Sequence, residues 1–154
     1  MISLSKASLK DITDAAENAY PSECCGLLAG HTDGLGSRLV TRVVLSPNLS
    51  SGDTRDSFEV DPRVRFNLMR NLEQAGNGET IVGHYHSHPD GSPVPSSRDL
   101  AMAYEPSLVW VIVAVHSGVV FETRAYVFTD DAGTFNEIPL RILDNLLYRV
   151  SQEA

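Results

Sequence analysis

The chain has 154 residues, of which 42% are apolar and 21% charged, and this composition is typical of a folded globular protein. Twelve Lys and Arg against twenty Asp and Glu give a formal net charge of -8. We therefore expect no nucleic acid and no anionic membrane as partner, because both bind basic patches. The length predicts a single domain, 1–154.

Hydrophobic periodicity predicts the elements of the first half of the chain. In chain order we expect a helix over 6–19, strands over 24–29 and 38–45 that form a hairpin, a brief strand over 58–60 and a helix over 62–75. The second helix has Asp61 as its expected N-cap and Pro62 at its first position, and Gly76 ends it.

The second half alternates strands, loops and helices. We expect a strand over 80–88, a helix that opens at 96, a strand over 108–115 buried on both faces, its hairpin partner over 119–128, an edge strand over 134–138 and a helix over 140–150. Hairpins outnumber crossover units, so the fold class is α/β (α+β), with a mixed, curved sheet flanked by helices.

Localisation and redox chemistry follow from what the sequence lacks. Residues 1–10 hold no apolar stretch of signal-peptide length, and the longest apolar run, 108–115, is too short for a membrane span. We therefore expect a cytoplasmic protein. The two cysteines, Cys24 and Cys25, are adjacent, which disfavours a disulfide between them. They are expected to pack as small apolar residues on opposite sides of a strand.

A metal site is indicated by the second half of the strand over 80–88. Alternate strand residues share a face, so His86 and His88 project together. Asp99 follows in the first turn of the next helix, where it could also act simply as a capping acid. Two imidazoles and a carboxylate are the usual ligands of catalytic zinc, with a fourth position left for water.

The other histidines are weaker candidates. His84 shares the face of His86 and His88, so a three-histidine site stays open, although the outer two would be too far apart to share one ion on a straight strand. His31 and His116 fall in predicted turns and are expected to lie in solvent.

The segments 22–28 (SECCGLL) and 86–89 (HSHP), followed by Ser96 and Asp99, resemble the JAMM motif of the MPN (JAB1/Mov34) metallopeptidases. Every motif position is present, and the resemblance covers about residues 21–104. It implies a fold similar to that of cytidine deaminases. One departure is His84, whose place is often held by an aromatic residue in relatives.

The resemblance implies a role for each residue of the motif. His86, His88 and Asp99 would hold zinc. Glu23 would hydrogen-bond the zinc-bound water and take its proton, and Ser96 would donate a hydrogen bond to the oxyanion of the intermediate. The chemistry is consistent, because zinc lowers the pKa of bound water to about 7 and a neighbouring carboxylate can then shuttle the proton.

The chain is close in length to the small prokaryotic members of the family, and some of these trim a residue or peptide from the C-terminal Gly-Gly tail of ubiquitin-like sulfur carriers. The resemblance thus implies a zinc peptidase that acts on the tail of a ubiquitin-like sulfur-carrier protein. Two alternatives remain: a non-catalytic MPN scaffold for protein–protein interaction, and a RadC-like protein of DNA metabolism.

Overall fold

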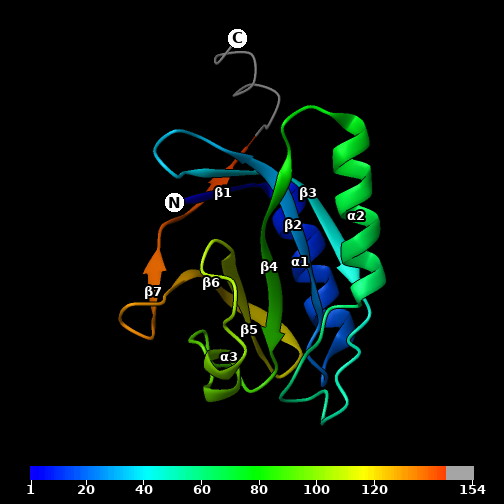
Figure 1. Cartoon of the computed structure of the whole chain (residues 1–154). Helices are drawn as coiled ribbons and strands as arrows, with labels where there is room; N and C mark the ends of the chain where they lie inside the picture. Colours follow the sequence, from blue (N-terminus) through cyan, green and yellow to red (C-terminus); the bar gives the residue numbers. More distant parts are fainter. Residues whose placement is uncertain (145–154) are drawn as a thin grey trace.

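The fold is a single curved sheet with helices on both faces, seen in a computed structural model that describes residues 1–144 (Figure 1). The elements are β1 (Ile2–Ser5), α1 (Lys6–Ala19), β2 (Cys25–Thr32), β3 (Arg38–Ser46), α2 (Pro62–Ala75), β4 (Thr80–His88), α3 (Ser97–Ala101), β5 (Val109–His116), β6 (Val119–Thr129), β7 (Thr134–Ile138) and β8 (Leu140–Leu143). The eight strands are ordered β7-β6-β5-β4-β2-β3-β1-β8. No helix within residues 1–144 is long and apolar enough to cross a membrane.

Helix α1 covers one face of the sheet. Its apolar stripe buries Ile12 and Ala16 among the inward residues of the strands, such as Leu28 and Tyr85. The Ser5 hydroxyl caps its first turn by accepting a hydrogen bond from the Ser8 amide (3.0 Å).

Helix α2 covers part of the opposite face. Leu68 and Leu72 pack on Leu27 and Ala29 of β2. The helix begins as the sequence predicts, because the Asp61 carboxylate accepts from the backbone of the first turn and Pro62 stands at its start. It ends at Gly76, which adopts the left-handed conformation (φ 61°) that glycine tolerates best.

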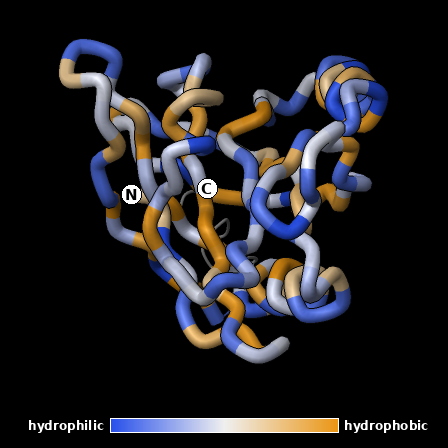
Figure 2. Tube along the Cα trace, turned by 90° about the horizontal axis from the view of Figure 1, so that it is seen from below, coloured by the Kyte–Doolittle hydropathy of each residue, from blue (hydrophilic) through white to orange (hydrophobic). Residues whose placement is uncertain are grey.

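Strand β4 lies in the middle of the sheet, antiparallel to β2 and parallel to β5. Its neighbour β5 is buried from Val109 to Val115, as expected for a central strand covered on both faces. Figure 2 shows the hydrophobic stretches gathered in the interior strands and the hydrophilic ones in the surrounding turns. Because β4 is hydrogen-bonded to β2 along one edge and to β5 along the other, it holds its side chains in fixed positions.

The sheet is so strongly curved that its two ends meet. Strands β7 and β8 stand at opposite ends of the strand order, yet only Pro139 separates them in the chain. The carbonyl of Pro139 accepts a hydrogen bond from the Ile2 amide (3.0 Å) as the chain crosses to β8. The sheet thus curves around α1, which contacts strands from both halves of the strand order.

Most predicted elements are confirmed, including both hairpins and the edge strand at 134–138. The predicted helix over 140–150 is wrong in its first part, because Leu140–Leu143 is a strand that pairs in parallel with β1; positions 145–150 lie outside the described residues. Strand β1 was not predicted, and the strand expected at 58–60 is reduced to a bridge between Val60 and Asn48.

The cysteine prediction is confirmed. Cys24 and Cys25 are both buried and unbonded to each other. Cys24 belongs to the cluster beneath α1, whereas Cys25 packs with Phe58 and Trp110 on the opposite face. Burial raises the pKa of the Cys25 thiol to about 12, so it is not a reactive thiolate.

Candidate metal centre

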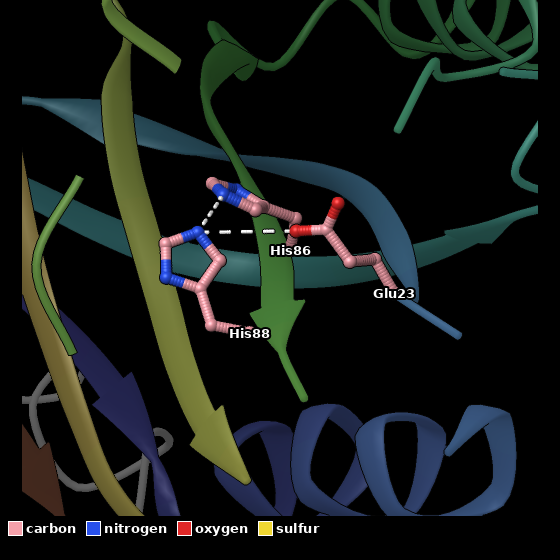
Figure 3. A group of neighbouring side chains, drawn as sticks. All are labelled: Glu23, His86 and His88. Carbon is pink, nitrogen blue, oxygen red and sulfur yellow. Dashed lines mark hydrogen bonds and ion pairs between the residues drawn. The ribbon is translucent and has the colours of Figure 1, made fainter. Parts of the chain in front are cut away.

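The end of β4 brings two imidazoles together. His86 and His88 point to the face opposite α1, and their Nε2 atoms lie 3.0 Å apart (Figure 3). The His86 ring is fully buried and stacks on Phe58, with ring centroids 4.2 Å apart. The strand therefore presents both rings in fixed orientations.

Asp99 reaches the same point from α3. Its Oδ1 lies 3.1 Å from His86 Nε2, and its Oδ2 lies 3.0 Å from His88 Nε2. The sequence left two roles open for Asp99, as a metal ligand and as a helix-capping acid. In the structure its carboxylate contacts both the imidazoles and the first turn of α3. Asp99 Oδ2 accepts from the Ser96 amide (2.8 Å), while Ser96 Oγ accepts from the Asp99 amide (3.1 Å), which forms a capping box. The cap fixes the carboxylate toward the imidazoles.

Glu23 arrives from the segment before β2. The antiparallel pairing of β2 with β4 places it level with His88, and Cys24 and Ser87 lock this register through two hydrogen bonds of 2.8 and 3.1 Å. Glu23 Oε1 lies 3.8 Å from His88 Nε2 (Figure 3). Glu23, His86 and His88 offer ligand-type atoms that all lie within 4.8 Å of one another. Asp99 is closer than Glu23 to the imidazoles, so Glu23 occupies the outer position of the group.

The polar loop over 47–57 holds the backbone of Glu23 in place. The sequence did not predict these contacts between the loop and Glu23. The Glu23 amide donates to the Thr54 carbonyl (2.7 Å), and its carbonyl accepts from the Asn48 side chain (3.1 Å). These contacts join positions 25 and 31 residues apart, and no local pattern signals them.

The buried charges shift one another's pKa values. Burial raises the pKa of Glu23 to about 8, against the opposing effect of His88. Burial also lowers the pKa of His86. For His88, burial acts downward but the Asp99 carboxylate outweighs it, so the pKa is raised. For Asp99, burial acts upward but contact with both imidazoles outweighs it, and the pKa lies well below its usual range.

The donor set fits a divalent cation such as zinc. His88 Nδ1 donates to the Ser92 carbonyl (2.8 Å), which leaves a lone pair on Nε2 of the neutral ring. That lone pair faces Asp99 Oδ2 and His86 Nε2 at 3.0 Å, and both of these are also acceptors in their unprotonated forms. Converging acceptors repel one another unless a proton or a metal ion lies between them. Two imidazoles and one carboxylate match the usual ligands of catalytic zinc.

The remaining sequence candidates divide clearly. Ser96 is exposed beside the centre, and its side-chain oxygen caps α3 by accepting a hydrogen bond from the Asp99 amide. His84 lies further back on β4, edge-on to Trp110 with ring centroids 4.3 Å apart, and is not part of the cluster. Burial lowers the pKa of His84 to about 3. His31 and His116 are exposed as expected, although both lie at the ends of strands rather than in turns.

Comparison with known proteins agrees with this geometry. Residues 5–128 match the family described as prokaryotic homologs of the JAB domain. The chain belongs to this family. A relative named desampylase, from Haloferax volcanii, is 36% identical over 104 residues, which span 68% of this chain and 70% of the relative. A CysO-cysteine peptidase from Mycobacterium tuberculosis is 29% identical over 129 residues, 84% of this chain and 82% of that protein.

Solved structures confirm the fold of this prokaryotic JAB-domain protein. A protein from Desulfitobacterium hafniense superposes with a TM-score of 0.81 at 29% identity, covering 96% of this chain and 97% of that one. A JAB1/MPN domain protein from Archaeoglobus fulgidus gives a TM-score of 0.57 at 23% identity, covering 93% and 98%. The predicted family and the mixed, curved sheet with flanking helices are both confirmed.

Proposed function

We propose that the whole chain, 1–154, is one zinc-dependent peptidase domain of the JAMM type, and that it acts in the cytoplasm. The observation that carries the proposal is the convergence of two imidazoles and two carboxylates at the end of β4, where His86, His88 and Asp99 contact one another within 3.1 Å. Glu23 stands beside them without belonging to that inner contact. The peptidase names of the relatives support hydrolysis as the reaction class.

His86, His88 and Asp99 would hold the zinc ion. When bound, zinc supplies a Lewis acid and lowers the pKa of a coordinated water to about 7. The deep burial of these ligands and the two strands flanking β4 keep them in place, so little reorganisation is needed for binding.

Glu23 is proposed as the general base and acid. Its Oε2 is buried and has no hydrogen-bond partner among residues 1–144, so it is free to accept a proton from the attacking water. The same carboxyl can then give that proton to the leaving amine. Its carboxylate form would be favoured by a nearby cation, which offsets the effect of burial on its pKa.

Ser96 is proposed to stabilise the developing oxyanion. Its oxygen already accepts from the Asp99 amide, so its hydroxyl hydrogen is the donor left over. Donors placed where negative charge develops are among the strongest contributors to catalysis. Ser96 would thus serve as cap and donor together.

The substrate proposed is a peptide or isopeptide bond at the C-terminal tail of a ubiquitin-like sulfur-carrier protein. The names of the relatives support this choice, since one is named CysO-cysteine peptidase and another desampylase. The chain has a net charge of -8 and no basic run, which speaks against the alternative of a RadC-like protein of DNA metabolism. The alternative of a non-catalytic scaffold would not need Glu23 buried beside the ligands.

The test is cleavage of a purified carrier protein that carries a short peptide after its Gly-Gly end. Mass spectrometry of the zinc-loaded chain with this carrier should show the peptide released, and the same chain treated with chelator should leave the carrier intact. Intact carrier after prolonged incubation with the zinc-loaded chain would contradict the proposed activity.

A further inference from the structure

A second cavity opens beside the metal centre. It has a volume of about 420 Å³ and is lined mainly by apolar side chains, together with one imidazole and the charged side chains of Glu59, Arg65 and Glu105; we call it the His84 pocket. Its principal lining residues are Phe58, Val60, His84, Met102, Tyr104 and Trp110. This size and a mostly apolar lining are typical of ligand pockets.

The walls of the His84 pocket are tied together. Arg65 of α2 holds Glu105, which follows α3, through two parallel hydrogen bonds of 2.6 and 2.7 Å. This fork-to-fork pair fixes the distance between α2 and the segment after α3. The ion pair therefore joins two walls of the pocket and helps to keep its shape.

One polar atom in the pocket lacks a partner. Nδ1 of His84 is buried and has no hydrogen-bond partner among residues 1–144. The ring itself lies edge-on to Trp110 (ring centroids 4.3 Å apart) and tilted against Phe58 (5.9 Å). A buried polar atom of this kind usually belongs with a ligand or an ordered water.

The strand register indicates on which side of the scissile bond the His84 pocket lies. Glu23 lies level with His88, whereas His84 is paired with Leu27, four residues further along β4. If Glu23 delivers the proton to the leaving amine, as proposed above, the leaving group lies at the His88 end. The acyl part of the substrate then extends toward His84.

Strand geometry also sets the distance. His84 is two residues from His86 and four from His88, and an extended chain advances about 3.3 Å per residue. A tail crossing the face of β4 from the metal centre therefore reaches the pocket with its third residue. It must pass over this face, above the Phe58 ring that covers the buried His86, because both edges of β4 are already paired with β2 and β5.

We propose that the His84 pocket binds the third residue before the scissile bond and selects a large apolar side chain there, which lies against the His84 and Trp110 rings of the pocket wall. The inference rests on the proposed peptidase function. It adds a specificity site to that function and names the position and chemistry of the residue it reads.

The test uses fluorescein-labelled peptides with Gly-Gly before the scissile bond and alanine, leucine or aspartate as the third residue. Binding is measured by fluorescence anisotropy on the zinc-loaded Glu23→Gln chain, and cleavage is measured separately on the wild type. We expect the leucine peptide to bind at least about tenfold more tightly than the alanine peptide, the scale of burying one apolar side chain. Moving the leucine to the leaving side should abolish the gain.

A matched pair of variants locates the effect. Met102→Trp fills the pocket and should remove the preference for leucine, whereas Met69→Trp, on the exposed side of α2, should leave it unchanged. Equal affinity for the leucine and alanine peptides, or a preference that survives Met102→Trp, would overturn the pocket assignment. Preferential binding without cleavage by the wild type would instead refute the peptidase function and leave the pocket in place.

Discussion

Replacing Glu23 with glutamine separates a peptidase from a metal-bound scaffold. The change keeps the size of the side chain and alters none of the three proposed zinc ligands, His86, His88 and Asp99. The hydrogen bonds that hold this position, from the Glu23 amide to Thr54 and from Asn48 to the Glu23 carbonyl, involve only the Glu23 backbone and therefore survive. Zinc content should stay at the wild-type level while the proton acceptor is lost.

The expected loss of activity follows from the role of the carboxylate. General acid–base help contributes about 10²–10⁴-fold, and Glu23 would act in both halves of the reaction. We therefore expect kcat for carrier cleavage to fall by at least about 10²-fold, measured by mass spectrometry at saturating carrier. A Glu23→Gln chain that cleaves as fast as the wild type would refute the mechanism, even with zinc present.

The same substitution has a stability signature in the metal-free protein. The pKa of Glu23 is about 8 when folded, against its ordinary 4.5, so between these pH values the folded state keeps a proton that the unfolded state has lost. Stability conferred by this group is thus full below pH 4.5 and falls as pH rises toward 8. At 1.36 kcal/mol per pH unit, the loss at pH 7 is about 3 kcal/mol.

The glutamine side chain does not titrate, so the Glu23→Gln variant does not lose this stability as the pH rises. Its metal-free form should therefore melt higher than the metal-free wild type at pH 7, by roughly 6–12 °C for a chain of this size, and the two should converge near pH 4.5. Thermal melts across this pH range measure the difference. A gap that stays constant with pH would show that the buried carboxyl does not carry the raised pKa.

Three further predictions test the site and its surroundings. His86→Ala and Asp99→Ala should each lose most of the one zinc expected per chain in elemental analysis, whereas His84→Ala should retain it; loss of zinc from the His84 variant would contradict the observed strand register. Ser96→Ala should keep zinc but lower kcat by about 10²–10³ and stability by about 1 kcal/mol, so full activity would reduce its role to capping. Tyr85→Phe removes a buried hydroxyl with no partner among residues 1–144, so denaturant unfolding should show unchanged or higher stability, by up to about 1 kcal/mol.

Local patterns in the sequence were sufficient to predict most of the helices and strands near the site. The caps at Asp61 and Gly76 bounded α2, and the His-Ser-His-Pro segment with Asp99 identified the residues that meet at the end of β4. Glu23 was found only through the family motif, because its proximity to His88 depends on a strand pairing between segments more than sixty residues apart. That the motif residues act as proposed stays a prediction.

The strands and hydrogen bonds that the sequence did not predict share a physical cause. Leu140–Leu143 forms a strand only because β1, nearly the whole chain away, offers it an edge, and the leucine spacing after it favoured a helix. Strand β1 itself is four residues long and too short for its alternation to stand out. The hydrogen bonds of Asn48 and Thr54 to Glu23 are equally remote in sequence. Periodicity reports what a segment can form, and distant partners decide which form is taken.

The meeting of β1 with β8 has a consequence for how the protein is made. The pairing of Ile2–Ser5 with Leu140–Leu143 joins segments that leave the ribosome nearly 140 residues apart. Until the later segment emerges, β1 can pair only with β3, and its other edge stays open. Open strand edges in a growing chain are sites of wrong pairing. The β8 end of the sheet is thus completed only after translation has passed residue 143.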